Sequence, residues 1–106
     1  MNYDIALHAL GDETRRRILE RLRAGPCSVA SLAAGLPVSR PAVSQHLKVL
    51  KDAGLVRDEA AGTRRLYRAA PAGMMALRNW LNGFWSEVFA DYDAEIQRQM
   101  DERRST

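Results

Sequence analysis

Cysteine is nearly absent from this chain of 106 residues, which contains only Cys27. A single cysteine cannot form an intrachain disulfide, and it lacks the second thiol that the simplest redox switch requires. No run of about 18 apolar residues occurs, so we expect no transmembrane helix. The start of the chain, Met1 to Asp4, has neither the basic segment nor the apolar stretch of a secretion signal. We therefore expect a cytoplasmic protein that does not bind membranes.

Catalytic motifs are also missing. The chain has two histidines, His8 and His46, and neither has a recognisable nucleophile and carboxylate near it in the sequence. There is no glycine-rich phosphate loop and no nucleophile elbow. These gaps argue against an enzyme, and no cofactor is expected. For His8 we expect a structural role.

Positive charge is concentrated in the middle of the chain. The formal net charge is +3, but residues 39–68 alone carry seven basic and three acidic side chains, a net +4. The segments on either side, 1–38 and 69–106, carry +1 and −2. A basic segment of this kind is typical of a face that binds a polyanion.

The length predicts a single domain over 1–106 with one modest core. Capping and apolar patterns predict helices over 4–10, capped by Asp4, over 13–23, capped by Asp12, and over 28–35, opened by Ser28. A fourth helix starts beside Pro41, with either Ser39 or Arg40 as its cap, and ends at Gly54. Strands over 55–59 and 64–68 flank a turn at 61–63, and a long helix follows Pro71 over about 74–99. The predicted fold is mainly α with a small β-hairpin.

Residues 28–54 are typical of a helix-turn-helix, whose second helix has one apolar and one polar side. At about 100° per residue, Val43, Leu47 and Leu50 form a stripe that must face the core. Recognition helices present their N-terminal residues to base edges in the major groove. We expect Arg40 to contact guanine and Gln45 adenine, with Ser44 on a base or a phosphate and Lys48 and Lys51 on phosphates.

The hairpin, residues 55–69, adds a basic wing. Charged residues on one exposed helix face are commonly only solvated, but cations on a turn directly after that helix favour DNA binding. The predicted DNA-binding residues are Ser39, Arg40, Pro41, Ser44, Gln45, His46, Lys48, Lys51, Thr63, Arg64 and Arg65, with Arg68 beside them. His46 lies on the flank of the helix, where packing or hydrogen bonding is favoured over base contact.

The last helix has an apolar face too wide for one small core. Its large apolar residues span an arc of about 180°, whereas a helix on a single core needs a stripe only a little over 100° wide. We therefore expect a partner chain to cover the excess, and a homodimer with two-fold symmetry would hold two recognition helices about one DNA turn apart. The arc contains Leu77, Trp80, Leu81, Phe84, Trp85, Val88, Phe89, Tyr92 and Ile96.

The stretch Val38 to Val56, VSRPAVSQHLKVLKDAGLV, resembles the signature of the ArsR/SmtB family of bacterial winged-helix repressors. GDETRRRIL, residues 11–19, is similar to the family's second helix, and GTRRLYR, residues 62–68, to its wing. The resemblance covers nearly the whole chain. It implies a dimeric repressor that binds a palindromic operator, in many cases at its own promoter. It also implies a dimer interface formed by the first and last helices, which adds Ile5 and Leu7 to residues 77–92.

Metal sensing, for which this family is known, does not carry over. A thiolate site needs at least two cysteines in or near the third helix, and only Cys27 stands there. The last helix has Asp91, Asp93 and Glu95 but no histidine, so these carboxylates are expected to be solvated. We expect no metal site, and no residue pattern identifies an effector.

The alternative function is a winged-helix module used only for protein–protein assembly. Such modules tend to lose the basic groups of the recognition helix and wing, which this chain keeps.

Overall fold

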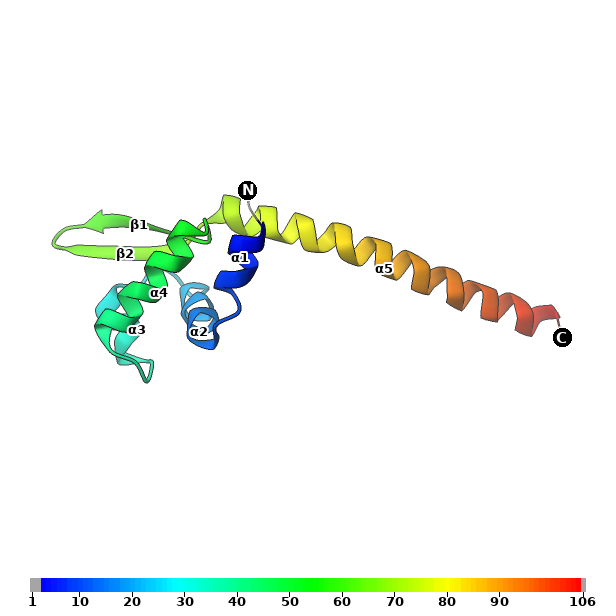
Figure 1. Ribbon diagram of the computed structural model, residues 1–106, viewed down its shortest axis with the longest axis horizontal. Helices are drawn as coiled ribbons and strands as arrows, with labels where there is room; N and C mark the ends of the chain where they lie inside the picture. The colour runs from blue at the N-terminus through cyan, green and yellow to red at the C-terminus, as the bar shows by residue number, and fades with distance from the viewer. Residues whose placement is uncertain (1–2, 106) are drawn as a thin grey trace.

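The computed structural model describes residues 3–105. Five helices and one hairpin follow in the order α1 (Tyr3–Ala9), α2 (Glu13–Leu22), α3 (Val29–Ala34), α4 (Arg40–Asp52), β1 (Val56–Ala61), β2 (Arg64–Ala69) and α5 (Pro71–Ser105). Figure 1 shows α1 to β2 gathered in one body, from which α5 projects far to one side. The molecule accordingly measures 72 × 28 × 21 Å. The predicted mainly helical fold with a small hairpin is confirmed.

Side-chain caps begin three of the helices where the sequence predicts them. The Asp12 carboxylate accepts a hydrogen bond from the backbone N–H of Arg15 at 3.0 Å, and the Ser28 hydroxyl accepts one from Ser31 at 3.1 Å. Ser39, rather than Arg40, caps α4, because its hydroxyl accepts the N–H of Ala42 at 3.2 Å. Each cap satisfies one of the N–H groups left unpaired at a helix start.

The predicted cap at Asp4 is wrong. The first helix already includes Tyr3, so the Asp4 carboxylate lies within the first turn. An acidic side chain there still interacts favourably with the positive end of the helix dipole. The signal in the sequence was therefore that of a first-turn acid, which is hard to distinguish from a cap.

The two strands pair antiparallel, from Val56 with Ala69 to Ala61 with Arg64. The turn consists of Gly62 and Thr63, and Gly62 has a φ of +65°, a conformation that favours glycine. The hairpin extends further toward its tip than predicted, since Ala60 and Ala61 pair despite their small side chains. Cys27 extends the sheet with a single bridge to Tyr67, whose two backbone hydrogen bonds measure 2.9 and 2.8 Å.

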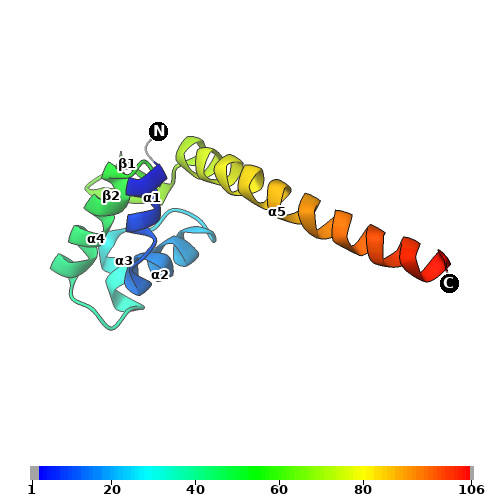
Figure 2. The ribbon, with the colours of Figure 1, turned by 45° about the vertical axis from the view of Figure 1, so that its right-hand side comes forward.

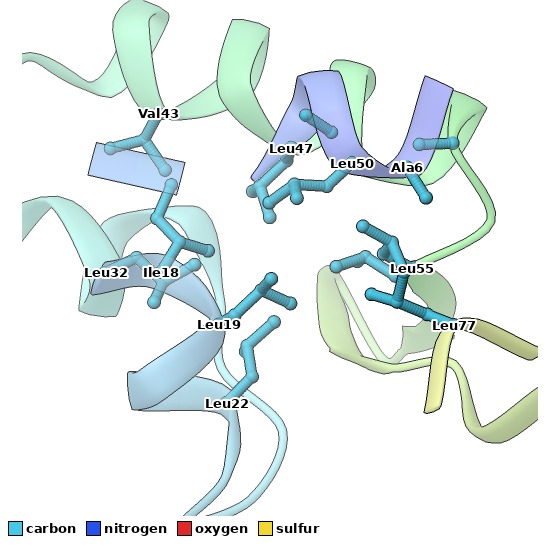
Figure 3. Close-up of a cluster of buried hydrophobic side chains, with 13 residues drawn as sticks. Ala6, Ile18, Leu19, Leu22, Leu32, Val43, Leu47, Leu50, Leu55 and Leu77 are labelled. Atoms are coloured by element: carbon cyan, nitrogen blue, oxygen red, sulfur yellow. The ribbon is translucent and has the colours of Figure 1, made fainter. Parts of the chain in front are cut away.

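The core lies between α1, α2, α3, α4 and the start of β1. Ile18, Leu32, Val43 and Leu50 are fully buried, and Leu47 is 1% exposed. Figure 3 shows these side chains converging with those of Ala6, Leu19, Leu22, Leu55 and Leu77. The apolar stripe predicted for α4 is thus the side that faces the core.

The last helix is longer than predicted, since it begins at Pro71 and continues to Ser105 instead of covering about 74–99. Proline suits a helix start because its missing N–H would have no partner there. Buried Gly73 then lets α5 cross directly over the turn between α4 and β1. A Cβ atom at Gly73 would lie 1.7 Å from the carbonyl oxygen of Gly54, so only glycine permits this crossing.

Beyond that crossing, α5 soon leaves the body. Leu77 is 5% exposed and belongs to the core, and Leu81 is partly buried against it. Every residue from Asn82 to Arg104 is exposed, and Figure 2 shows this part of the helix standing free of the body from a second direction. None of the described helices has a stretch apolar enough to cross a membrane.

Candidate nucleic-acid interface

The polar side of α4 is open, as predicted. Ser39, Arg40, Pro41, Ser44, Gln45, Lys48 and Lys51 are all exposed. Within the described part of the chain, the side chains of Arg40, Ser44 and Gln45 form no hydrogen bond or ion pair. Their donors and acceptors are therefore available to another molecule. The position of α4 in the body explains this, because Val43, Leu47 and Leu50 commit the opposite side to the core.

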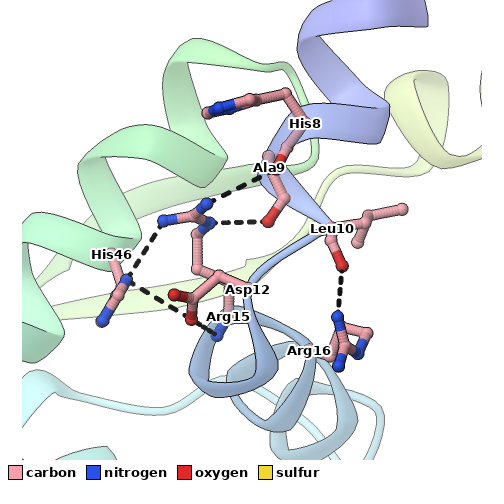
Figure 4. Close-up of polar contacts among 7 residues, drawn as sticks. All are labelled: His8, Ala9, Leu10, Asp12, Arg15, Arg16 and His46. Atoms are coloured by element: carbon pink, nitrogen blue, oxygen red, sulfur yellow. Dashed lines mark hydrogen bonds and ion pairs between the residues drawn. The ribbon is translucent and has the colours of Figure 1, made fainter.

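His46 lies where α4 contacts the start of α2, rather than on the open side of α4. Its side chain is only 22% exposed, and its Nδ1 lies 3.4 Å from Arg15 Nη1 and 4.0 Å from Asp12 Oδ1. Figure 4 shows the same Arg15 guanidinium turned toward the end of α1, where Nε donates to the carbonyl oxygen of Ala9 at 2.6 Å. Arg15 thus links α1, α2 and α4. His46 thus packs between these helices and faces a hydrogen-bonding partner, the environment that the helical projection favours, and its contact with DNA stays a prediction.

His8 contributes to the same contact between helices through its backbone. Its carbonyl oxygen accepts a hydrogen bond from Arg15 Nη2 at 3.4 Å, while its side chain is exposed. The carbonyl of Ala9 lies at the end of α1, where no helical N–H remains to bind it, whereas the carbonyl of His8 also accepts the N–H of Gly11 at 3.0 Å. Arg15 therefore holds α1 in place by capping it.

The turn of the wing exposes Thr63, Arg64 and Arg65. Arg64 forms no hydrogen bond or ion pair within residues 3–105, whereas Arg65 Nη1 lies 2.7 Å from Asp58 Oδ2. Arg68 pairs with Glu59 at 2.5 Å on the other face of the hairpin. The three arginines that look equivalent in the sequence thus differ in how free they are to bind an anion.

Both lysines of α4 are also paired within the chain. Lys48 Nζ lies 3.2 Å from Asp52 Oδ2, one turn further along the helix, and Lys51 Nζ lies 2.7 Å from Asp58 Oδ1 on β1. The hydrogen bond from Lys51 and, after it, the one from Arg65 lower the pKa of Asp58 below its ordinary value. Asp58 is therefore ionised at neutral pH and neutralises part of the charge on two predicted phosphate ligands.

Arg57 is an exposed cation that the predicted site does not include. It stands on β1 opposite Arg68 and has no ion-pair partner among the residues with assigned positions. Its position directly after Val56 in the strand could have suggested that it is exposed, because Val56 is buried. Strand alternation places Arg57 on the exposed face of the hairpin.

A shallow groove of about 570 Å³ separates the start of α3 from the wing. The hydroxyl-bearing Ser28 and Ser31 line one side of it, and Arg64, Arg65 and Tyr67 line the other. Hydroxyl and guanidinium groups are the side chains that proteins commonly use to contact the phosphates of DNA. The groove thus places side chains suited to phosphates between α3 and the wing.

A second surface, on α5, is apolar. Exposed side chains include Phe89 at 54% and Tyr92 at 61%. The rings of Trp80, Phe84, Trp85 and Phe89 contact one another along the helix with centroids 5.4–6.1 Å apart, stacked except where Phe84 meets Trp85 edge to face. Ile5 and Leu7 are exposed on α1, which packs beside α5. Met75, Ile96 and Met100 add to this surface. Exposed apolar patches of this extent mark sites of protein association.

Leu77 and Leu81 do not belong to that surface in the way the sequence predicts. Leu77 is buried in the core of its own chain, and Leu81 packs partly against it. Both lie where α5 still touches the body, so the core of the same chain buries much of their apolar area. We therefore remove Leu77 from the predicted dimer interface and retain Leu81 at its margin.

Metal ligands do not gather anywhere in the described residues, which contain no group of three or more histidine, cysteine, aspartate or glutamate side chains able to hold an ion. Cys27 is a partly buried free thiol whose sulfur lies 3.6 Å from the carbonyl oxygen of Gly25. It packs against the core cluster.

Comparison with known proteins agrees with this geometry. Residues 10–59 match the family model described as a helix-turn-helix domain. The chain is 54% identical to the HTH-type transcriptional regulator Rv2034 of Mycobacterium tuberculosis, over 93% of this chain and 92% of that protein. It is 32% identical to the transcriptional repressor SdpR of Bacillus subtilis, over 72% and 84%.

Solved structures show the same architecture. An ArsR-like transcriptional regulator from Rhodococcus sp. RHA1 superposes with a TM-score of 0.74 at 36% identity, over 89% of each chain. The homodimeric winged helix-turn-helix DNA-binding domain of a possible ArsR-family regulator from Mycobacterium bovis gives a TM-score of 0.66 at 28% identity. That match covers 80% of this chain and 79% of that one.

Proposed function

The chain belongs to the ArsR/SmtB family of winged helix-turn-helix transcriptional regulators, and we propose that it is a homodimeric repressor that binds a palindromic operator. It is a DNA-binding transcriptional regulator. The proposal adds the residues that bind the operator, the surface that forms the dimer, the cytoplasm as the place of action, and the absence of catalysis and of a metal response. The observation that carries it is the open side of α4, where Arg40 and Gln45 are exposed and unpaired.

Sequence recognition is assigned to the first two turns of α4. Arg40 reaches guanine and Gln45 reaches adenine through paired hydrogen bonds in the major groove, and Ser44 lies between them on the same side. Each such contact discriminates against a wrong base by about 1–3 kcal/mol. Ser39 and Pro41 lie at the start of α4, where the backbone comes nearest to the DNA.

Phosphate contacts are assigned to the cations around that helix. Arg64 at the tip of the wing and Arg57 on β1 are unpaired, and Lys48 is held only by a bridge within an exposed helix. Such exposed pairs contribute about 0–1 kcal/mol, so Lys48 can exchange Asp52 for a phosphate. Thr63 adds a hydroxyl donor at the turn.

The dimer is assigned to the apolar surface of α5 together with Ile5 and Leu7 of α1. Residues 82–104 are all exposed, yet this stretch carries five large exposed apolar side chains within nine residues: Phe84, Trp85, Val88, Phe89 and Tyr92. Aromatic side chains can bury about 150–250 Å² each. The homodimeric relative from Mycobacterium bovis supports a second copy of this chain as the partner.

Replacing Phe89 with aspartate tests the dimer. A carboxylate inside an apolar interface would have to be buried without a partner, so F89D is expected to sediment as a monomer at concentrations where the wild type is a dimer. Glu87→Gln is the control, since about 100° per residue places Glu87 outside the apolar arc. A dimeric F89D, or a monomeric wild type, would contradict the assignment.

Operator binding is tested by a gel shift on the DNA upstream of the chain's own gene, repeated over a range of salt concentrations. We expect binding at least about 10³-fold tighter than to random DNA of the same length. Binding no tighter than to random DNA would overturn the proposal and favour an assembly module. Because the described residues offer no metal-ligand cluster, the affinity should be the same with Zn²⁺ and with a chelator.

A further inference from the structure

One carboxylate of the wing forms an ion pair with α4. Lys51 Nζ, in the last turn of α4, lies 2.7 Å from Oδ1 of Asp58, and Arg65 Nη1, on β2, lies 2.7 Å from Oδ2. The two oxygens thus hold one cation each, from two different elements. The Asp58 side chain is only 9% exposed, whereas Lys51 and Arg65 are 53% and 57% exposed. An acid is enclosed between two cations that otherwise face solvent.

Glu59, the next residue, forms a different kind of pair. It binds Arg68, a diagonal neighbour on the partner strand and on the other face of the sheet, and it does not reach α4. Within residues 3–105, Asp58 is the only acidic side chain of the hairpin that pairs with the recognition helix. Its bond to Lys51 therefore constrains the position of the wing relative to α4. Its bond to Arg65, like the Glu59–Arg68 pair, connects the two strands of the wing.

The same carboxylate accounts for part of the difference between paired and unpaired cations in the basic segment, residues 39–68. Seven arginines and lysines lie between residues 39 and 68, and four of them are paired within the chain, two by Asp58 alone. Arg40, Arg57 and Arg64 remain unpaired in the described structure. Phosphates compete with Asp58 for Lys51 and Arg65, but not for these three.

We propose that Asp58 is a positioning residue for operator recognition, which fixes the wing against the end of α4 and keeps Lys51 and Arg65 from binding DNA of any sequence. This inference rests on the proposed operator binding. Non-specific affinity depends on the number of phosphates that are neutralised, whereas specific affinity also depends on helix and wing meeting the DNA in one arrangement. Asp58 lowers the non-specific affinity and supports the specific affinity.

The test compares Asp58→Asn with Glu59→Gln. Both variants remove one negative charge from neighbouring positions of the same strand, but only D58N breaks the link to α4. Affinities for the operator and for random DNA are measured for the homodimer between 50 and 200 mM salt, and thermal unfolding verifies the fold.

D58N frees two cations, so its salt slope on random DNA is expected to be steeper than that of the wild type by up to about 1.8, against about 0.9 for E59Q. The ratio of operator to random affinity should fall by about tenfold in D58N, comparable to one mismatched base pair. In E59Q the ratio should be unchanged. Equal ratios in the two variants would overturn the inference.

Lys51→Met provides an independent measurement, because it removes the α4 half of the link without removing the acid. We expect a lower operator-to-random ratio and an unchanged salt slope. A slope flatter by about 0.9 with an unchanged ratio would mean that Lys51 binds a phosphate, and would overturn the inference. A wild type that does not distinguish operator from random DNA would overturn the proposed function itself, so the two failures are distinguishable.

Discussion

Replacing Gly73 with alanine tests how the last helix is anchored to the DNA-binding body. The added Cβ atom would lie 1.7 Å from the carbonyl oxygen of Gly54 and 2.6 Å from its carbonyl carbon. Side-chain carbons essentially never approach closer than 3.0 Å, so α5 would have to retreat by about 1.3 Å. The turn cannot easily yield instead, because Gly54 has a φ of +77° and Leu55 after it is fully buried.

The size of the effect follows from two opposing terms. Overpacking of this kind typically costs about 1–3 kcal/mol, and the retreat of α5 also loosens Leu77 in the core. Alanine recovers up to about 1 kcal/mol through its higher helix propensity. We therefore expect a net loss of about 1–2 kcal/mol, and each kcal/mol lowers the Tm of a domain of this size by about 4–8 °C.

Gly83→Ala is the matched control, since it makes the same chemical change in the same helix. A Cβ atom at Gly83 would meet nothing within 4 Å, and the helical projection places Gly83 outside the apolar arc. This variant should be as stable as the wild type or up to about 1 kcal/mol more stable. Thermal unfolding followed by circular dichroism, at equal protein concentrations because the chain is proposed to dimerise, measures both. A Gly73→Ala variant as stable as Gly83→Ala would refute the close crossing.

Two further predictions concern binding and pH. Arg40→Ala and Gln45→Ala should each relax specificity at individual operator positions by about 1–3 kcal/mol. Arg64→Ala should instead weaken binding to all sequences and flatten the salt slope by about 1. Gel shifts on single-base operator variants separate the two patterns, and a uniform loss of affinity in Arg40→Ala would contradict its role. The cap hydrogen bond from Arg15 lowers the pKa of Asp12, so its stabilising effect is present above the unfolded value near 3.8 and is lost as the pH falls through the lower folded value. Asp12→Asn retains a cap that does not titrate, and urea unfolding between pH 6 and pH 2.5 should show a smaller acid-induced loss than in the wild type.

Much of the fold could be predicted because its signals are local. A cap acts within three residues, as at Asp12, Ser28 and Ser39, and a two-residue turn at Gly62 pairs the strands on either side of it. The errors arose where local signals are ambiguous. Asp4 can serve as a cap or as a first-turn acid, and Pro71 can precede a helix or begin one.

The predicted site was correct about exposure and incomplete about partners. The helical period alone places Arg40, Ser44 and Gln45 on the open side of α4, and no element comes near enough to change that. His46 lies on the flank, where the approach of Arg15 from α2 decides its environment. Arg57 was missed although it follows the apolar Val56 in a predicted strand, because the alternation of one short strand was not used to assign its exposed face.

By itself, the sequence determined which side of each helix is apolar, where the helices are capped, and that the positive charge follows the recognition helix. These properties depend on neighbours within one or two turns, so they are present before any element packs. Only the tertiary structure decided that Asp58 pairs with Lys51 and Arg65, and that Gly73 crosses Gly54. It also decided that Leu77 is buried in the core of its own chain while Phe89 stays exposed. Those outcomes depend on which elements cross and at what distance, and a few ångströms separate a free cation from a paired one.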